Sequence, residues 1–277
     1  MTGARVVAWD GETVGAWADE VEGAEVVINL AGRSVNCRYN AANLKEMMDS
    51  RVNSTRAVGE AIRLAKDPPR IWLQAATATI YAHRFDAPND EYTGILGGAE
   101  PGSNPTWDAS IAIAKAWEKT LEDAVTPHTR KVALRSAMTM STDTGSVFDV
   151  LCNLARRGLG GTLGDGKQFV SWIHEDDFCA SLRFLIDREG LSGAINICAP
   201  NPLPQREFMA DLREALGVKF GLPASKWMVE LGTWAMRTES ELVLKSRRVV
   251  PTRLLEARFE FKFPEWRGAC QELAGQA

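Results

Sequence analysis

The stretch Val26–Gly32 (VVINLAG) has the residue types of a ligand-binding strand end. Four apolar positions, three of them β-branched, predict a strand that is buried on both faces, as in a parallel sheet. The strand stops at Asn29-Leu30-Ala31-Gly32, where small residues let a ligand approach the backbone closely. In open α/β sheets, ligands bind beyond the carboxyl ends of such strands. The alternative is an ordinary turn from strand to helix.

The segment Gly158–Gly164 (GLGGTLG) fits a G-x-x-G-x-x-G pattern, which in other proteins cradles phosphate groups. That chemistry needs a strand before the glycines and a helix after them. Here a predicted helix, 147–157, precedes the glycines, and the turn Asp165-Gly166 follows them. We therefore expect a loop or a helix cap.

Acid–base and metal chemistry have few candidates among the histidines and cysteines. His174 precedes a predicted helix and could orient substrate or act as an acid or base. The alternative is that its ring holds the preceding loop by hydrogen bonds. His83 and His128 lack metal-ligand spacing, and the five cysteines form no C-x-x-C pair. The sequence thus predicts no metal site.

Hydrophobic patterning places these residues in an alternating β-α order. Apolar runs predict strands at 5–10, 26–30, 71–76, 131–135 and 194–198. Spacing near 3.6 residues predicts helices at 13–22, 43–66, 107–124, 147–157, 175–187 and 205–216. Residues 82–106, rich in Gly, Pro, Asn and Asp, predict a long surface loop. This alternation predicts an α/β fold with a doubly wound, mostly parallel, Rossmann-like sheet.

Length and composition are those of a cytoplasmic globular protein. The 277 residues can form one large domain or two unequal ones, and we expect a nucleotide-binding domain at 1–200 and a helical lobe at 201–277. The net charge of −4 gives no indication of nucleic acid or an anionic membrane as a partner. No apolar run is long enough to span a bilayer, and no signal peptide is evident.

Six motifs in order resemble one family. They are VVINLAG, DSRVNSTRAVGEAI, QAATATIYA, GDGKQFVSWIHEDD, GAINICAPNPLPQREF and VVPTRLLEARFEF. Together they resemble the NAD(P)-dependent epimerase/dehydratase group of extended or atypical short-chain dehydrogenases. Within it they resemble the nucleoside-diphosphate-sugar epimerase-like subfamily, which has a C-terminal domain of unknown function. The resemblance covers nearly the whole chain, and 164–177 and 250–263 are its most specific parts.

The resemblance implies a cofactor, a reaction and positions for both. The cofactor is NADP or NAD, with NADP favoured, and the reaction is hydride transfer to or from a small or nucleotide-linked hydroxyl or carbonyl substrate. Residues 29–32 match the strand end that contacts the cofactor riboses, and Arg51 matches a helix position that faces the cofactor. Thr77 matches the Ser/Thr that hydrogen-bonds the substrate oxygen. Arg135 follows the third strand of the resemblance, near the expected nicotinamide edge.

Each of these positions also has a plainer interpretation. Arg51 can equally be a surface arginine on its helix. Thr77 can cap its own turn at the end of a strand.

The beginning of the chain departs from this pattern. Family members start with a strand, a Gly-rich turn and a helix whose N-terminus holds the cofactor pyrophosphate. Residues 1–10 already resemble the third strand of that series, so the chain is expected to lack the first β-α-β unit. We then expect an exposed apolar edge on 26–30, or a partner that covers it, for example in a homodimer. Without that unit, cofactor binding itself is in question.

The catalytic pair departs as well. Short-chain dehydrogenases use a Y-x-x-x-K pair, in which the Tyr is the general acid or base and the Lys binds the nicotinamide ribose. Lys115 lies on the expected helix, but Ile111 stands four residues before it. Lys115 can also be a solvated helix lysine. The proton donor is therefore open between water, Tyr81 and His174, and the alternative function is a non-catalytic binding protein with the same fold.

Overall fold

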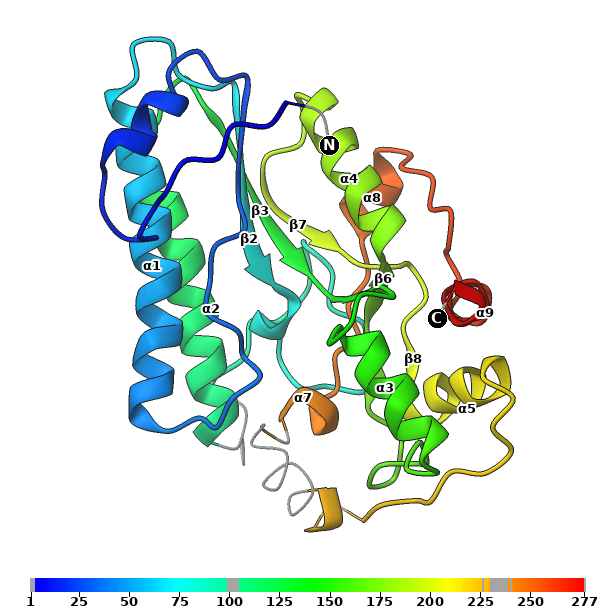
Figure 1. The fold of residues 1–277 in the computed structure, drawn as a ribbon. Coiled ribbons are helices and arrows are strands. Elements are labelled where there is room, and N and C mark those ends of the chain that lie inside the picture. Colours follow the sequence, from blue (N-terminus) through cyan, green and yellow to red (C-terminus); the bar gives the residue numbers. More distant parts are fainter. Residues whose placement is uncertain (1–2, 99–104, 226, 230–238, 240, 277) are drawn as a thin grey trace.

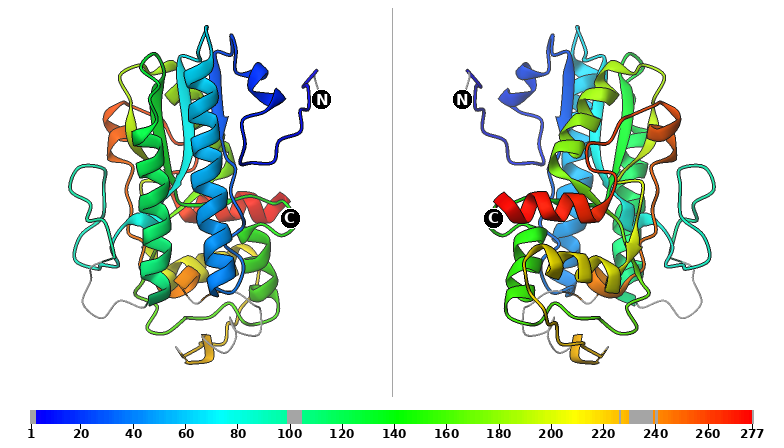
Figure 2. Two further views of the ribbon diagram at one scale, coloured as in Figure 1. Left: turned by 90° about the vertical axis from the view of Figure 1, so that its left-hand side faces the viewer. Right: turned by 90° about the vertical axis from the view of Figure 1, so that its right-hand side faces the viewer.

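The computed structural model describes residues 3–98, 105–225, 227–229, 239 and 241–276. A central sheet lies between two helical layers, and a group of helices packs beside it (Figure 1). Seen from the side, α1 and α2 stand next to each other in front of the sheet (Figure 2).

The central sheet is parallel, with the order β1-β2-β3-β7. Its strands are β1 (Val26–Asn29), β2 (Ile71–Thr77), β3 (Arg130–Ser136) and β7 (Gly193–Ile197). Val26 lies opposite Ile71, and Ile71 opposite Arg130, so the strands start at one level. Their carboxyl ends therefore meet at one edge, as the sequence predicted, and the α/β fold with a parallel sheet is confirmed.

Strand periodicity of two divides the sheet residues between the two helical layers. Ile71, Leu73, Val132 and Leu134 pack beneath α4 (Glu175–Asp187) and α8 (Thr252–Glu256). Trp72 and Ala133 face α1 (Ala41–Leu64) and α2 (Pro105–Asp123) instead. Because both faces are covered, β2 is apolar at five of its seven positions, and β3 is apolar at its three central positions, Val132, Ala133 and Leu134.

A second core lies beside the sheet, around the buried ring of Trp266. It joins α3 (Val147–Arg156), α5 (Gln205–Ala215) and α9 (Trp266–Gln276). The Trp266 ring stacks on Phe208 at 4.0 Å between ring centroids. The structure also has two short strand pairs and a further short helix. These are β4 (Met138–Met140) with β6 (Trp172–His174), β5 (Phe169–Val170) with β8 (Leu203–Pro204), and α7 (Glu241–Leu244). The division at residue 200 stays a prediction.

Two expectations for the first 25 residues are wrong. The predicted strand 5–10 has no strand partner, and Val6 is 93% exposed. Trp9 of this run packs against Trp17 instead, with 4.6 Å between the ring centroids, and both indoles donate to the carbonyl of Thr13. The predicted helix 13–22 is only the short 3₁₀ helix η1 (Ala16–Glu20).

Strand β1 also departs from the prediction that both of its faces are buried. Within the described residues its sole neighbour is β2, so one edge is open. Ile28 is 44% exposed and the following Leu30 is 57% exposed. The expected exposed apolar edge is thus present.

The loop predicted at 82–106 lies only partly on the surface in its described part. Asn89 is fully buried, and its backbone pairs with the carbonyl of Arg248 and the amide of Val250. The 3₁₀ helix η2 (Ala78–Ile80) leads into this loop, and residues 99–104 lie outside the described part. Within the described residues, no helix has the length and apolar character needed to cross a membrane.

Candidate functional site

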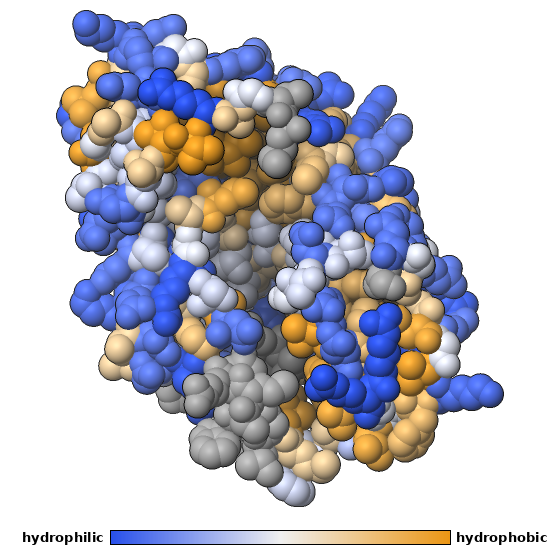
Figure 3. All heavy atoms as spheres, viewed as in Figure 1, coloured by the Kyte–Doolittle hydropathy of each residue, from blue (hydrophilic) through white to orange (hydrophobic). Residues whose placement is uncertain are grey.

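The candidate site lies at the edge of the sheet where the parallel strands end. On the face drawn in Figure 3, the surface is hollowed between the α1–α2 side and the α3–α4 side of the molecule. This is the edge at which open parallel sheets bind ligands.

Asn29 shapes the turn that leaves β1. Its amide nitrogen donates to Gln74 Oε1 (3.0 Å), and its oxygen accepts from the amide of Ala31 (3.0 Å). Both Asn29 and Gln74 are buried, so this pair fixes the strand end. Leu30 points outward, whereas Gly32 lies against a helix residue: a Cβ on Gly32 would stand 3.5 Å from the Arg51 guanidinium carbon. The predicted cofactor residues 29–32 and Arg51 therefore do come together.

The Arg51 guanidinium lies between this turn and α2. Its Nη1 donates to the carbonyls of Arg33 and Met47, at 3.1 Å each, and the group stands 5.0 Å from the centre of the Trp117 ring. No carboxylate among the described residues pairs with it. Burial lowers the pKa of Arg51, yet an arginine keeps its charge at neutral pH. A half-buried cation that lacks a counter-ion suits an anionic ligand.

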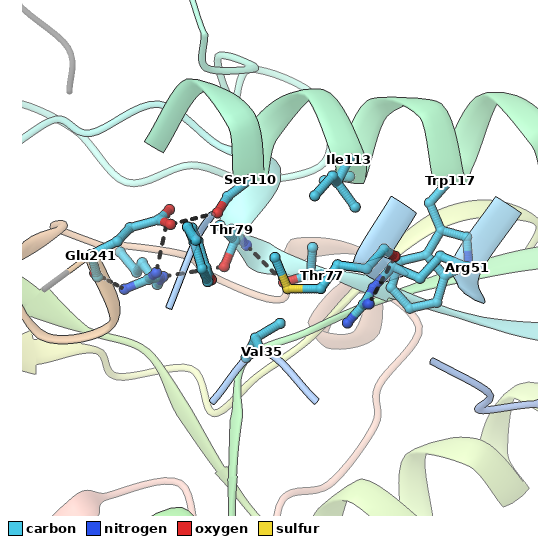
Figure 4. Close-up of a pocket in the computed structure, with 12 residues that line it drawn as sticks. Val35, Arg51, Thr77, Thr79, Ser110, Ile113, Trp117 and Glu241 are labelled. Atoms are coloured by element: carbon cyan, nitrogen blue, oxygen red, sulfur yellow. Dashed lines mark hydrogen bonds and ion pairs between the residues drawn. The ribbon is translucent and has the colours of Figure 1, made fainter. Parts of the chain in front are cut away.

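A cavity of about 90 Å³ adjoins Arg51 and reaches under α2. Figure 4 shows Ser110, Ile113 and Trp117 pointing from α2 into it, with Thr77 and Arg51 on the other side. The residues that line it are Val35, Tyr39, Met47, Arg51, Thr77, Thr79, Ser110, Ile113, Ala114, Trp117, Glu241 and Arg247. A typical ligand pocket has about 300 Å³ or more, so this cavity can hold only the end of a ligand.

Hydroxyl groups gather at one end of the cavity. Thr77 Oγ1 accepts from the amide of Thr79 (3.1 Å), which leaves the Thr77 hydroxyl proton available to a ligand. Ser110 Oγ donates to Glu241 Oε2 (2.5 Å). Thr77, a predicted site residue, therefore lines the cavity. It also caps its own turn, so the two interpretations of Thr77 are compatible.

A buried charge cluster closes the same end. Glu241 Oε1 lies 3.7 Å from Lys245 Nζ and 3.8 Å from Arg247 Nη2, and it receives no hydrogen bond from the described residues. Lys245 donates to the carbonyl of Thr79 (2.8 Å). Burial raises the pKa of Glu241, although Arg247, Ser110 and Lys245 act in the opposite direction.

Tyr39 enters the cavity from the loop between β1 and α1. Its backbone amide donates to Glu239 Oε1 (2.8 Å), which ties this loop to the C-terminal segment. Burial, together with the charge of Glu241, raises the pKa of Tyr39 to about 12, although the neighbouring Ser110 hydroxyl and the charge of Arg247 act in the opposite direction. The phenol is therefore neutral across the physiological range.

Two other predicted residues meet each other away from the cavity. Arg135 makes a two-pronged pair with Glu118 (2.8 and 2.7 Å) and donates to the hydroxyl of Tyr81 (2.8 Å). The Tyr81 hydroxyl in turn donates to Asn196 Oδ1 (2.9 Å). Tyr81 is 2% exposed and lies outside the cavity lining. This network has the contacts of a structural element, and the predicted catalytic role of Tyr81 and cofactor role of Arg135 stay untested.

Lys115 and His174 also hold structure together. Lys115 Nζ donates to the carbonyl of Gly97 (2.6 Å), and Ile111 is buried beside it. His174 Nδ1 accepts from the amide of Asp176 (3.0 Å) at the start of α4, and its Nε2 lies 3.0 Å from Glu272 Oε2. Both contacts differ in detail from the plainer interpretations: Lys115 is bonded to a loop carbonyl, and His174 caps the helix that follows it. The site roles of the two residues stay predictions.

Five polar residues of the cavity were not singled out as site residues from the sequence: Tyr39, Thr79, Ser110, Glu241 and Arg247. The family pattern placed the active face of α2 at positions 111 and 115. The residues of α2 that line the cavity are at positions 110, 113, 114 and 117 instead. The apolar pattern of 113, 114 and 117 could have given this register. Glu241 and Arg247 carry no local signal, since they arrive from a segment remote in sequence.

The Gly158–Gly164 loop is confirmed as a helix cap rather than a phosphate loop. Gly158 has a positive φ of 76° directly after α3, and its amide donates to the carbonyl of Ala155 (2.9 Å). Gly161 is packed so tightly that a Cβ would stand 2.1 Å from the carbonyl oxygen of Leu222. Backbone of the same chain therefore occupies the space at Gly160 and Gly161.

Comparison with known proteins decides the family. Residues 8–198 match the model of the NAD dependent epimerase/dehydratase family, and residues 224–273 match a domain of unknown function, DUF1731. The chain belongs to the NAD dependent epimerase/dehydratase family. The resemblance noted from the sequence motifs is thereby confirmed.

Similar proteins are named for the family and not for a reaction. The chain is 28% identical to the mouse epimerase family protein SDR39U1 over 256 residues, covering 90% of this chain and 82% of that protein. It is 29% identical to an epimerase family protein of Staphylococcus epidermidis over 258 residues, covering 93% and 82%.

Two solved structures are similar in fold. The human epimerase family protein SDR39U1 (isoform 2), solved with NADPH, has a TM-score of 0.82 at 26% identity, covering 94% of this chain and 86% of that one. A nucleoside-diphosphate sugar epimerase from Corynebacterium glutamicum has a TM-score of 0.72 at 23% identity, covering 97% and 50%. The second likeness shows the fold alone.

Proposed function

We propose that this protein is an NADP- or NAD-dependent oxidoreductase or epimerase-like enzyme that acts on a small or nucleotide-linked hydroxyl or carbonyl compound. One observation carries the proposal: the strand end 29–32, the cation of Arg51 and the hydroxyl of Thr77 converge beside one cavity at the carboxyl edge of a parallel sheet. NADP is favoured over NAD, and the NADPH in the related human structure supports this choice.

The residues present suit part of a dinucleotide. The missing side chain at Gly32 leaves room beside the Arg51 guanidinium, and that guanidinium lacks a carboxylate partner among the described residues. Residues 29–32 and Arg51 would hold the cofactor there through backbone contact and positive charge. When bound, the cofactor supplies or accepts the hydride.

Thr77 would orient the substrate oxygen at the inner end of the site. Its hydroxyl can donate to a carbonyl oxygen while its own oxygen accepts from the amide of Thr79. The small size of the cavity limits the reacting end of the substrate to a few heavy atoms, and Ile113 and Trp117 shield that end from water. The remainder of the substrate would lie in the open hollow of Figure 3.

Titration with NADPH and with NADH, followed by cofactor fluorescence, tests the proposal. We expect saturable binding, tighter for NADPH. Arg51→Met should weaken it at least about tenfold, which corresponds to about 1.4 kcal/mol. Arg56→Met, on the same helix but exposed, is the matched control and should change the affinity less than about twofold. Absence of binding at millimolar cofactor would exclude catalysis by this chain.

A second candidate, a binding protein without catalysis, is favoured by one observation. The open edge of β1 presents unpaired backbone groups and the exposed side chains of Ile28 and Leu30. Such an edge can pair with another chain, for example in a homodimer. Light scattering during size exclusion tests this: Ile28→Lys should convert a dimer into a monomer, and a stable wild-type monomer would count against an edge-mediated partner.

A further inference from the structure

We propose that Tyr39 donates the proton in this site and that Ser110 and Glu241 position it. The inference rests on the proposed function, which leaves the proton donor open. It adds a residue from the loop after β1, a place where neither the sequence motifs nor the family pattern puts a catalytic tyrosine.

Position is the first argument. The chain has three tyrosines, and all lie in the described part. Tyr39 lines the cavity together with Thr77. Tyr81 is buried in the Arg135 network, and Tyr92 is 63% exposed with its hydroxyl on Glu256 (2.7 Å). Of the three phenols, Tyr39 alone shares the cavity with the hydroxyl proposed to hold the substrate oxygen.

The register of α2 is the second argument. Helix α2 turns Ser110 and Ala114 toward the cavity, and neither can supply a proton as an acidic side chain. Ile111 is 2% exposed, and Lys115 is bonded to the carbonyl of Gly97. The helix that carries the Y-x-x-x-K pair elsewhere therefore offers no phenol here, and the phenol comes from the loop on the opposite wall.

Fixation of the Tyr39 loop is the third argument. Asn40 caps α1 by accepting from the amide of Asn43 (2.9 Å), and the backbone of Tyr39 is held by Glu239. The Ser110 hydroxyl, which donates to Glu241 Oε2 (2.5 Å), lines the same cavity as the phenol. A proton donor must be held in place, and the first two contacts restrain the backbone at Tyr39.

The groups around Tyr39 act on the pKa of its phenol in both directions. Glu241 and Cys37 oppose ionisation of the phenol, whereas Arg247 and the Ser110 hydroxyl favour it. Arg51, on α1, is also within electrostatic reach. With burial added, the neutral phenol prevails. The neutral phenol carries the proton that reduction of a carbonyl requires.

The step balances as a carbonyl reduction. A hydride from the reduced nicotinamide forms the new C–H bond, and the carbonyl π pair moves to oxygen. That oxygen takes the proton from Tyr39 Oη as the O–H bond of the phenol breaks. The phenolate then regains a proton from water, and the sum is one carbonyl reduced to one alcohol as the nicotinamide is oxidised.

Three conservative variants, Tyr39→Phe, Tyr81→Phe and Tyr92→Phe, test the assignment. The measurements are NADPH affinity by fluorescence and the NADPH-dependent reduction of methylglyoxal and of glyoxylate, two probes with a short reacting end. We expect Tyr39→Phe to lower kcat at least about 100-fold, within the range for general acid catalysis, and to leave NADPH affinity unchanged. Tyr92→Phe is the exposed control and should keep wild-type rates. A Tyr39→Phe rate within threefold of wild type would overturn the proposal.

A readout without turnover accompanies the rates. Protein labelled with ¹³C at the tyrosine ζ position gives three signals, which the three variants assign. Methylglyoxal or glyoxylate should shift the Tyr39 signal and leave the Tyr92 signal in place. A third outcome separates the two proposals. If NADPH binds but neither probe is reduced and neither probe shifts the Tyr39 signal, the inference about Tyr39 fails while the cofactor proposal stands. If NADPH does not bind, the proposed function itself fails.

The positioning role is tested by the pH profile. Glu241→Gln removes a charge that raises the pKa of Tyr39, so the alkaline fall in reduction rate should begin at a lower pH than in wild type. Ser110→Ala removes the cavity-lining hydroxyl that is bonded to Glu241, and it should lower kcat more than it changes KM for the probe. An unchanged alkaline limb in Glu241→Gln would show that Glu241 is merely structural.

Discussion

Two buried polar networks flank the end of β3, and they are satisfied to different degrees. In the first, Arg135 meets both oxygens of Glu118 and the hydroxyl of Tyr81 within 2.8 Å. In the second, Glu241 Oε1 lies 3.7 and 3.8 Å from its cations and receives no hydrogen bond from described residues. The first network lies outside the lining of the candidate-site cavity, whereas the second lines it.

The difference distinguishes structural polar groups from functional ones. A fully paired buried network fixes side chains and leaves nothing for a ligand. An incompletely paired network beside a cavity retains hydrogen-bonding capacity that a ligand can complete. Residue type alone does not separate a structural network from a functional one. Each of the two has an arginine and a glutamate with a tyrosine nearby.

The largest expected effect breaks the first network. Glu118→Gln leaves the buried Arg135 guanidinium without its counter-ion and should lower the free energy of unfolding by about 3 kcal/mol. Urea denaturation measures it. The exposed Glu122 on the same helix is the control, and Glu122→Gln should change stability by less than about 0.5 kcal/mol. Equal effects of both variants would contradict the structural role of the first network.

A smaller effect on stability separates the buried Tyr81 from the half-buried Tyr39. Tyr81→Phe removes hydrogen bonds to Asn196 and Arg135 and should cost about 1–2 kcal/mol of unfolding free energy. Tyr39→Phe, which faces a cavity, should cost less than Tyr81→Phe. The reverse order, measured in the same urea titration, would remove the distinction between the networks.

The pH dependence of stability tests the second network. The pKa of Glu241 is raised above its ordinary value of 4.5, so its contribution to stability is fully present below that pH and is lost as pH rises through the raised value. Glu241→Gln should therefore be less sensitive to pH than wild type above pH 4.5. Unfolding free energies measured at pH 4.5 and at pH 8 give the comparison, and an identical slope in both proteins would contradict it.

The smallest expected effect concerns Lys115, which the family pattern would place on the nicotinamide ribose. Lys115→Met should lose one hydrogen bond to the Gly97 carbonyl, worth about 1 kcal/mol or less, and leave NADPH affinity unchanged within twofold. A tenfold loss of NADPH affinity would restore the ribose-binding role to Lys115.

Patterns that depend on neighbours in sequence were predictable here. Burial on both faces makes most of β2 and the centre of β3 apolar, and helical spacing gave α1 and α4 to within a few residues. The strand end at Asn29–Gly32 followed from the pattern of a parallel sheet. Arg51 and Thr77 followed from the family resemblance, and the structure places both beside the same cavity.

Patterns that depend on remote neighbours were not predictable. The run at 5–10 looks like a strand, but nothing in the described fold pairs with it. Ile28 looks like a core residue, yet it is exposed because β1 has a neighbour on one side only. Glu241 and Arg247 join the site through a chain reversal some 160 residues after Thr77, which no local motif encodes.

Hydrogen–deuterium exchange with and without NADPH tests the central claim most directly, because it reports where the cofactor binds. We predict slower amide exchange in residues 29–35, 47–51 and 77–81, the segments that surround Arg51 and Thr77. Residues 158–164 should exchange equally in both states. Protection confined to 158–164, or none in the three segments at saturating NADPH, would contradict the account.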